Sequence, residues 1–290
     1  MRSPRSKKPP IVCLLAVCLL AVCLNIVRSP LISKEHTSNF GLHTKFTFMI
    51  ASRNDNYQGE PVLRLEASLK ALLVALDQFG LTSSTEILVV DWSSEQPLVD
   101  SEPIKRLRKI STTCTRWIYL AGDLLEMPDD RLSEVHALNA ASRRAKGDIL
   151  LRLDQDTILS PTFFEWFVKY HYLFHGDAYT LLGRRDSGPG ARDAIMEHPW
   201  EYVSNSTNMR NTPHWHGEYD FVNGIGAVGV IIFTKSMWFK IQGYNEKMTG
   251  WGHMEIDLWK LAKLVTPALE PVGLQDRWPA LHIYHERLSY

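Results

Sequence analysis

The stretch Lys146-Gly147-Asp148-Ile149-Leu150-Leu151-Arg152-Leu153-Asp154-Gln155-Asp156 decides the fold. Four of the five residues from Ile149 to Leu153 are large aliphatics, a pattern typical of a strand that is covered on both faces. The run ends in two carboxylates, Asp154 and Asp156, which have no use in a core. Ligands of open α/β sheets bind at the carboxyl ends of strands, so we expect a site here. The two carboxylates could share a divalent cation, or they could form only a polar turn before a helix at Pro161.

The chain before this strand alternates between strand-like and helix-like patterns. We expect strands at 46–50, 86–90 and 117–120, and helices at 61–80, 104–109 and 132–145. This alternation predicts parallel strands joined by right-handed crossovers. The polar residues that follow three of the strands would then lie along one edge of the sheet and form a nucleotide pocket: Arg53, Asp55, Asp91, Asp154 and Asp156.

The chain after Pro161 is less regular. We expect an aromatic-rich helix, a strand at 179–183, and then a long irregular segment from 184 to 220, which is typical of a lid or a binding loop. Residues 224–229 match the G-x-G-x-x-G pattern of dinucleotide sites. That pattern must open a helix, whereas a strand-like run begins at Val228, so we do not interpret it as a nucleotide fingerprint.

A second polar cluster lies in residues 250–259. A helix is expected to begin near His253, with Glu255 and Asp257 in its first turn, where the helix dipole favours carboxylates. Either these two acids only cap the helix, or they act on a ligand beside Trp251. The ring of Trp251 could stack on the apolar face of a sugar.

Two histidines, His282 and His285, follow the last apolar run of the chain. A lone late histidine is usually structural, but two at this spacing indicate that one of them binds a metal together with the aspartates. Imidazole combined with carboxylate suits Mn²⁺ better than Mg²⁺ or Ca²⁺, which prefer oxygen ligands.

The N-terminus predicts a membrane segment. Residues 1–10 carry four basic residues and no acid, and residues 11–27 are apolar except for Asn25. A cleaved signal peptide and a signal anchor are both compatible with this pattern, and we favour a transmembrane anchor at 11–27. The basic flank would leave residues 1–10 in the cytosol, with a stem at 28–45 and a lumenal domain at 46–290. Such a short span suits the membrane of the Golgi or the endoplasmic reticulum.

Composition excludes some functions. After residue 28 the chain has 27 basic and 32 acidic residues without a basic cluster, so we expect no binding to nucleic acid. Three of the four cysteines lie in the apolar segment, which leaves Cys114 alone, and we expect it to be buried. Asn205-Ser206-Thr207 is a glycosylation sequon, consistent with a lumenal domain.

These motifs together resemble the GT-A glycosyltransferases. The motifs that carry this resemblance are Arg53-Asn54-Asp55, Asp91, Asn139-Ala140, Asp154-Gln155-Asp156, and Gly250-Trp251-Gly252 through Asp257. The block from Asn223-Gly224 through Gly243-Tyr244-Asn245 to Asp257 most resembles the beta-1,4-galactosyltransferase and chondroitin-polymerase group of the family 2-like superfamily. The resemblance covers about residues 46–290. It implies a doubly wound, mostly parallel α/β sheet with a nucleotide-binding half and an acceptor-binding half.

The resemblance also implies roles for single residues. Arg53, Asp55, Asp91 and Asp154 would bind the donor nucleotide, and Asp154 and Asp156 would hold the metal, to which the histidines above add His282 or His285. Trp251 and Asp257 would bind the acceptor. Glu255 would be the catalytic base, with Asp257 beside it. One departure is Met254, where the galactosyltransferases have an acidic residue, and it leaves the acceptor open.

We therefore expect a metal-dependent, inverting enzyme that transfers a sugar from a nucleotide-sugar, a UDP-sugar, to a carbohydrate acceptor. One rival is a sugar-nucleotide nucleotidyltransferase, which would need a glycine-rich basic loop after the first strand, and residues 53–57 are not one. The other is a non-catalytic sugar-binding module. It would lack either the aspartate pair or Glu255, and the chain has both.

Overall fold

The computed structural model describes residues 45–55, 59–110, 113–120, 132–211, 228–248, 254–272, 274 and 279–285. The chain divides after Gly41 into two units, and every described residue belongs to the second, Leu42–Tyr290. The predicted tail, the predicted anchor at 11–27 and the stem up to residue 44 lie outside the described residues. Among the described helices, none is both long enough and apolar enough to cross a bilayer.

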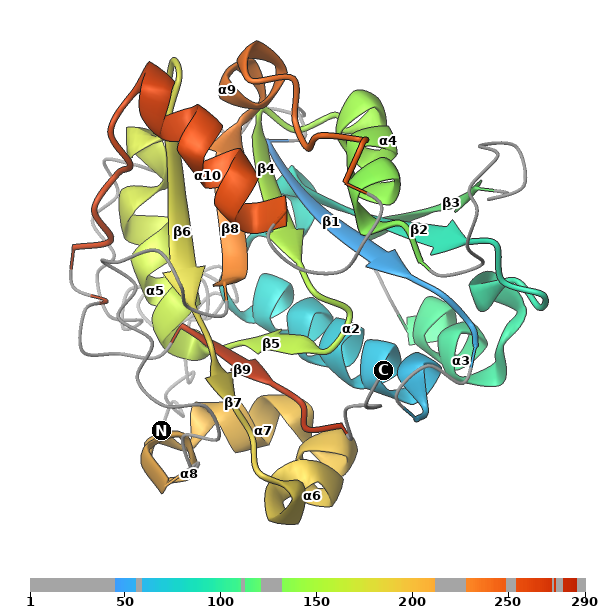
Figure 1. Cartoon of the computed structure of the whole chain (residues 1–290). Helices are drawn as coiled ribbons and strands as arrows, with labels where there is room; N and C mark the ends of the chain where they lie inside the picture. Colours follow the sequence, from blue (N-terminus) through green and yellow to red (C-terminus); the bar gives the residue numbers. More distant parts are fainter. Residues whose placement is uncertain are drawn as a thin grey trace, which may run out of the picture. The chain divides into compact units, whose positions relative to one another are not determined.

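A six-stranded sheet carries helices on both faces (Figure 1), and its strand order is β3-β2-β1-β4-β8-β6. The strands are β1 (Phe46–Ser52), β2 (Thr85–Trp92), β3 (Cys114–Leu120), β4 (Ile149–Leu153), β6 (Tyr179–Gly183) and β8 (Val228–Thr234). Strands β1 to β4 are parallel, as predicted. β8 runs antiparallel to both β4 and β6, so the sheet is mixed.

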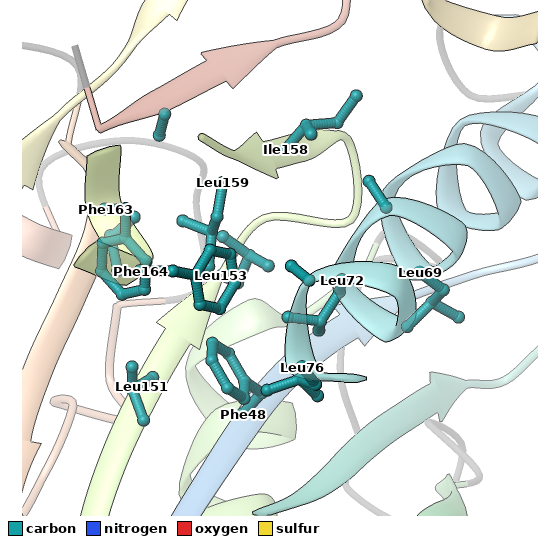
Figure 2. Close-up of a cluster of buried hydrophobic side chains, with 14 of the residues drawn as sticks. Phe48, Leu69, Leu72, Leu76, Leu151, Leu153, Ile158, Leu159, Phe163 and Phe164 are labelled. Atoms are coloured by element: carbon teal, nitrogen blue, oxygen red, sulfur yellow. The ribbon is translucent and has the colours of Figure 1, made fainter. Parts of the chain in front are cut away.

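Side chains of the strands alternate between two cores, one on each face of the sheet. In β1, Phe46, Phe48 and Ile50 point into the first core, whereas Met49 and Ala51 point into the second. Figure 2 shows the first core, where leucines of α2 meet β4 and the aromatic helix α5. The helices that contribute to this first core are α2 (Pro61–Gln78), α3 (Glu102–Ile110) and α5 (Pro161–Tyr170). The helices that contribute to the second core are α4 (Glu134–Arg144), α9 (Lys235–Lys240) and α10 (Met254–Val265).

The helix predicted from Pro61 is confirmed as α2 and shows how the sequence sets its limits. Pro61 occupies the first turn, where a missing N–H costs nothing. Past its end, Gly80 adopts a φ of +66°, a conformation that glycine tolerates best. The whole segment then leads directly into β2 through a 3₁₀ turn (Thr82–Ser84). Further 3₁₀ turns cover Leu98–Asp100, His171–Leu173 and Pro189–Ala191.

A second, three-stranded sheet was not predicted from the sequence. It consists of β5 (Thr157–Leu159), β9 (Ala280–His282) and β7 (Arg185–Asp186), in the order β5-β9-β7. β5 is antiparallel to β9, and β7 is parallel to it. Strands of two or three residues are too short to show a period of two, which is why the sequence pattern missed them. The small sheet begins directly after Asp156 and ends at His282.

Two other predictions are wrong. The segment predicted to be irregular from 184 onward contains β7 and the short helices α6 (Arg192–Glu197), α7 (Pro199–Ser204) and α8 (Ser206–Asn211); residues 212–220 lie outside the described residues. Apolar side chains of these helices join the first core, but six-residue helices are too short to show helical periodicity. Cys114 is exposed, not buried, because it begins β3, the edge strand of the large sheet. The sequon Asn205 lies exposed between α7 and α8.

Candidate active site

The polar residues that follow β1, β2 and β4 lie on one edge of the sheet, because the three strands are parallel and adjacent. Ser52 at the end of β1 is the register partner of Asp91 at the end of β2. Beyond β1, the Arg53 Nε atom lies 3.2 Å from Asp55 Oδ2. The sequence predicted that Arg53, Asp55 and Asp91 would lie at one edge of the sheet, and the structure places all three there.

Asp91 organises the loop at this edge. Its carboxylate accepts a hydrogen bond from the backbone N–H of Leu98 at 2.7 Å and another from the hydroxyl of Ser94. The same Ser94 hydroxyl accepts the backbone N–H of Asn54 at 2.7 Å. Burial raises the pKa of Asp91, although these hydrogen bonds and Arg53 oppose the shift. Asp91 therefore ties the loop after β2 to the loop after β1.

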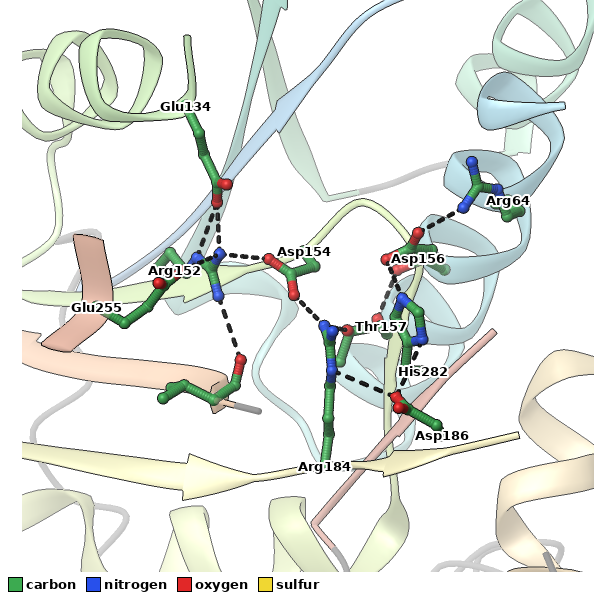
Figure 3. Close-up of polar contacts among 12 residues, drawn as sticks. Arg64, Glu134, Arg152, Asp154, Asp156, Thr157, Arg184, Asp186, Glu255 and His282 are labelled. Atoms are coloured by element: carbon green, nitrogen blue, oxygen red, sulfur yellow. Dashed lines mark hydrogen bonds and ion pairs between the residues drawn. The ribbon is translucent and has the colours of Figure 1, made fainter. Parts of the chain in front are cut away.

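Three of the four predicted metal ligands come together. His282 Nε2 lies 3.2 Å from Asp156 Oδ1, and His285 Nε2 lies 3.5 Å from Asp156 Oδ2. One ligand atom from each residue lies within 4.8 Å of the other two. One carboxylate and two imidazoles form a donor set that suits Mn²⁺, and this cluster is drawn in part in Figure 3.

Charged neighbours hold Asp156 in place. Arg64 of α2 is fully buried, and its Nη1 lies 2.7 Å from Asp156 Oδ2. Burial by itself would raise the pKa of Asp156, but His282, Arg64 and Arg184 outweigh it and hold that pKa well below its usual range. Burial and Arg184 lower the pKa of His282, whereas Asp156 and Asp186 raise it, and the net direction is upward. The aspartate thus stays charged.

Asp154, the fourth predicted ligand, lies with two guanidinium groups instead. Arg152 Nη2 approaches its Oδ1 to 2.6 Å, and Arg184 Nη1 contacts its Oδ2. Figure 3 shows the Asp154 carboxylate between the two arginines, and Arg184 in turn between Asp154 and Asp186. In this structure Asp154 therefore links Arg152 to Arg184, which also contacts Asp186.

Arg152 is a buried cation surrounded by three carboxylates. It contacts Glu255 Oε1 at 3.0 Å and Glu134 Oε1 from two of its nitrogens, besides Asp154. Burial raises the pKa of Glu134 to about 7, and the charges of Asp154 and Glu255 add to the rise against the opposing effect of Arg152. Glu255 lies in the first turn of α10, as predicted, and its ion pair with Arg152 holds the carboxylate at the same edge of the sheet as Asp156.

The motif Gly243-Tyr244 forms a turn that is hydrogen-bonded to α4. The side chain of Asn139 in α4 donates to the carbonyl of Tyr244 at 2.8 Å and accepts its N–H at 3.0 Å. Gly243 has a φ of +67°, and a Cβ there would lie 2.7 Å from Trp238 Nε1 and closer still to Asn139 Oδ1. The hydroxyl of Tyr244 is buried and has no hydrogen-bond partner within the described part of the chain. Only glycine fits at 243, so the turn is fixed.

The remaining predicted site residues are placed less fully. Trp251, with Gly250 and Gly252, lies outside the described residues. Asp257 is half-buried on α10 and makes no ion pair within the ranges that the structure describes. The sequence reasoning missed five residues of the charged network. Arg152 could have been noticed, because it is a charged residue in the middle of an apolar run. The other four residues, which have no such sequence pattern, are Arg64, Glu134, Arg184 and Asp186.

Comparison with protein families gives one match, to part of the chain. Residues 207–277, which include α10 with Glu255 and Asp257, match the family model described as the N-terminal domain of galactosyltransferase. No curated protein sequence matches the chain. The resemblance to galactosyltransferases that the sequence indicated is confirmed for this segment.

Many solved structures are similar in fold, and two of them serve as examples. One is the mannosyltransferase PcManGT from Pyrobaculum calidifontis in complex with GDP-Man and Mn²⁺, with a TM-score of 0.53 and 15% identity, covering 94% of this chain and 67% of that one. The other is TarS 1-349 of S. aureus, with a TM-score of 0.50 and 12% identity, covering 82% of this chain and 60% of that one. At these identities the likeness shows the fold, which is the predicted GT-A type. Fold and matched segment together support a glycosyltransferase.

Proposed function

We propose that the protein is a metal-dependent, inverting glycosyltransferase that transfers a sugar from a UDP-sugar to a hydroxyl of a carbohydrate acceptor. The observation that carries the proposal is the shared edge of the sheet. The cluster of Asp156, His282 and His285 lies there, and so does the acid Glu255. A series of ion pairs joins them, which runs from His282 through Asp186, Arg184, Asp154 and Arg152 to Glu255. A cation site and a separate acid are the two parts that such a transfer needs.

The donor would bind at the ends of β1, β2 and β4. The loops tied together by Asp91 carry Arg53 and Asp55, which would contact the nucleotide. Asp156, His282 and His285 would hold Mn²⁺, which when bound supplies the positive charge that stabilises a departing diphosphate. Arg184 adds a second positive charge next to Asp154. In this proposal the loop after β1 would bind the nucleotide, and the metal and Arg184 would offset the charge of the phosphates.

The acceptor would bind on the side of α10. Inversion needs one base opposite the leaving group, which takes the proton of the acceptor hydroxyl as that oxygen attacks the anomeric carbon. Glu255 would accept this proton, and the ion pair with Arg152 fixes where its carboxylate lies. Asp257, two residues further along the helix, points elsewhere around α10 and would orient the acceptor together with Trp251.

A donor screen tests the proposal. The full chain with Mn²⁺ is incubated with a panel of UDP-, GDP- and CMP-sugars and a panel of carbohydrate acceptors, and the released nucleotide is identified. We expect UDP from one UDP-sugar and a new glycoside. A parallel assay supplies a nucleoside triphosphate and a sugar 1-phosphate, and formation of a nucleotide-sugar with release of pyrophosphate there would favour the nucleotidyltransferase instead. Donor binding without any turnover would favour a sugar-binding module.

We also propose that residues 11–27 anchor the protein in the membrane of the Golgi or the endoplasmic reticulum with the catalytic domain in the lumen. The apolar run with its basic flank supports this location. Nucleotide-sugar donors and carbohydrate acceptors for the proposed reaction would have to be available in the same compartment.

A further inference from the structure

We propose that Asp186 is a positioning residue that orients His282 so that its Nε2 atom binds the metal. The inference rests on the proposed metal-dependent function and names a residue that the sequence gave no reason to select. Asp186 ends β7, and it is the direct register partner of His282 in the parallel pair β7–β9. On the other side of β9, Thr157, the residue after Asp156, is paired with His282. The small sheet thus brings both aspartates to one histidine.

The two nitrogens of His282 face different carboxylates. Nδ1 lies 3.1 Å from Asp186 Oδ1, and Nε2 lies 3.2 Å from Asp156 Oδ1. Figure 3 shows the imidazole ring of His282 between Asp156 and Asp186. If Nδ1 donates its hydrogen to Asp186, the neutral ring keeps its lone pair on Nε2, on the side of Asp156. A metal bound by Asp156 would therefore meet Nε2 as a ligand.

Asp186 lies on the far side of the ring from the metal cluster, so its role is orientation. Carboxylates that accept the second N–H of a metal-binding histidine fix its tautomer and raise its basicity. The charge of Asp186 is compensated, because Arg184 Nε lies 3.6 Å from Asp186 Oδ1 while the same guanidinium contacts Asp154. Because Arg184 compensates the charge of Asp186, the metal would not have to do so.

The backbone keeps this arrangement in register. Ser187 donates its N–H to the carbonyl of His282 at 2.9 Å, and the Ser187 hydroxyl accepts the N–H of Tyr284 at 2.8 Å. Ile283 donates its N–H to the carbonyl of Asp156 at 2.8 Å. The backbone from His282 to Tyr284 is thus held by these three hydrogen bonds. Rotation of the ring is then the main freedom left to His282, and a hydrogen bond from Nδ1 to Asp186 would limit it.

Mn²⁺ affinity tests the inference without using the transferase reaction. The full chain is titrated with Mn²⁺ alone, and free Mn²⁺ is measured by its EPR signal. We expect Asp186→Asn to weaken binding about 10-fold to 100-fold. Asp186→Glu, which keeps the carboxylate, should lose less. Asp193→Asn is the matched control, because it removes the same charge from a side chain that is 98% exposed, and it should bind like the wild type.

The outcomes separate the inference from the proposed function. If wild type binds Mn²⁺ and Asp186→Asn binds it equally well, the inference fails while the metal site stands. If wild type itself does not bind Mn²⁺, the metal-dependent function fails, and the inference fails with it. A ¹⁵N spectrum of histidine in the metal-free protein at alkaline pH, assigned with His282→Gln, gives a check that needs no folded Asp186 variant. We expect the Nδ1–H tautomer for His282, and the Nε2–H tautomer would overturn the proposal.

Discussion

The carboxylate of Glu255 shares the buried guanidinium of Arg152 with two other acids, so its position depends on an ion pair and not on the helix alone. Glutamine at 255 keeps the shape of the side chain and an oxygen that can accept a hydrogen bond from Arg152. Glu255→Gln should slow the chemical step about 10²-fold to 10⁴-fold and leave donor binding intact, because the amide cannot take the acceptor proton. Single-turnover rates and donor Kd values of the two proteins measure this.

A surface substitution gives the control for Glu255. Glu197→Gln removes the same charge from a side chain that is 76% exposed, and its turnover should equal that of the wild type. The competing interpretation is that Glu255 only caps α10. In that case Glu255→Gln would cost about 1 kcal/mol of stability or less and keep nearly normal turnover.

Asp156 should be indispensable, but the choice of substitution matters. Replacement by alanine would remove the carboxylate that pairs with the fully buried Arg64, and breaking such a buried ion pair costs about 3–5 kcal/mol in stability. Asp156→Asn keeps a hydrogen-bond acceptor for Arg64 and removes the charged metal ligand. We expect this variant to fold, to lose most Mn²⁺ binding and to lose nearly all turnover. Full turnover of Asp156→Asn, or of wild type in excess chelator, would show that the cation has no catalytic part.

The raised pKa of Glu134 predicts how the free energy of unfolding changes with pH. Its pKa is raised from 4.5 to about 7 in the folded protein, so between these values the folded state binds more protons than the unfolded state. Its contribution therefore becomes less favourable as the pH rises through that window. The advantage of the wild type over Glu134→Gln should shrink between pH 4.5 and pH 6.5, measured by denaturant unfolding. A constant difference would mean that Glu134 is not protonated there.

At the scale of elements, a substitution of Gly243 tests our explanation of the turn at Gly243-Tyr244. Gly243 and Gly80 have nearly the same φ, +67° and +66°, but only at Gly243 would a Cβ collide with neighbours. Alanine in the left-handed conformation costs about 1–2 kcal/mol, so Gly80→Ala should lose about that much. Gly243→Ala should lose clearly more and should also reduce turnover, since Tyr244 would move. Equal unfolding free energies for the two variants would contradict this account of the turn.

The elements that the sequence predicted are those whose pattern is long enough to show a period. The strand at 149–153 and the helix from Pro61 are examples, because burial on the sheet requires a continuous or periodic apolar pattern. β7 and β9 have two and three residues, so the sheet that joins Asp186 to His282 had no sequence signal. Arg64 lies 92 residues from its partner Asp156, and nothing local marks it. Cys114 was predicted to be buried because the edge position of β3 depends on the order of the strands, which local pattern does not give.

At the scale of the whole molecule, the proposed anchor predicts how the protein partitions. The intact protein should stay with membranes after a carbonate wash, and Asn205, which is exposed, should carry an N-glycan that a glycosidase removes. Recovery of a soluble protein that begins near Leu24 would mean that residues 11–27 belong to a cleaved signal peptide.

The central claim is that one edge of the sheet combines a cation site with a base that acts from the opposite side of the donor sugar. The stereochemistry of the product tests it most directly. With a donor of known anomeric configuration and Mn²⁺, the configuration of the new glycosidic bond is read by NMR. The account predicts the opposite configuration to that of the donor, formed only when Mn²⁺ is present. A product with the donor's own configuration, or one formed at the same rate after chelation, would contradict it.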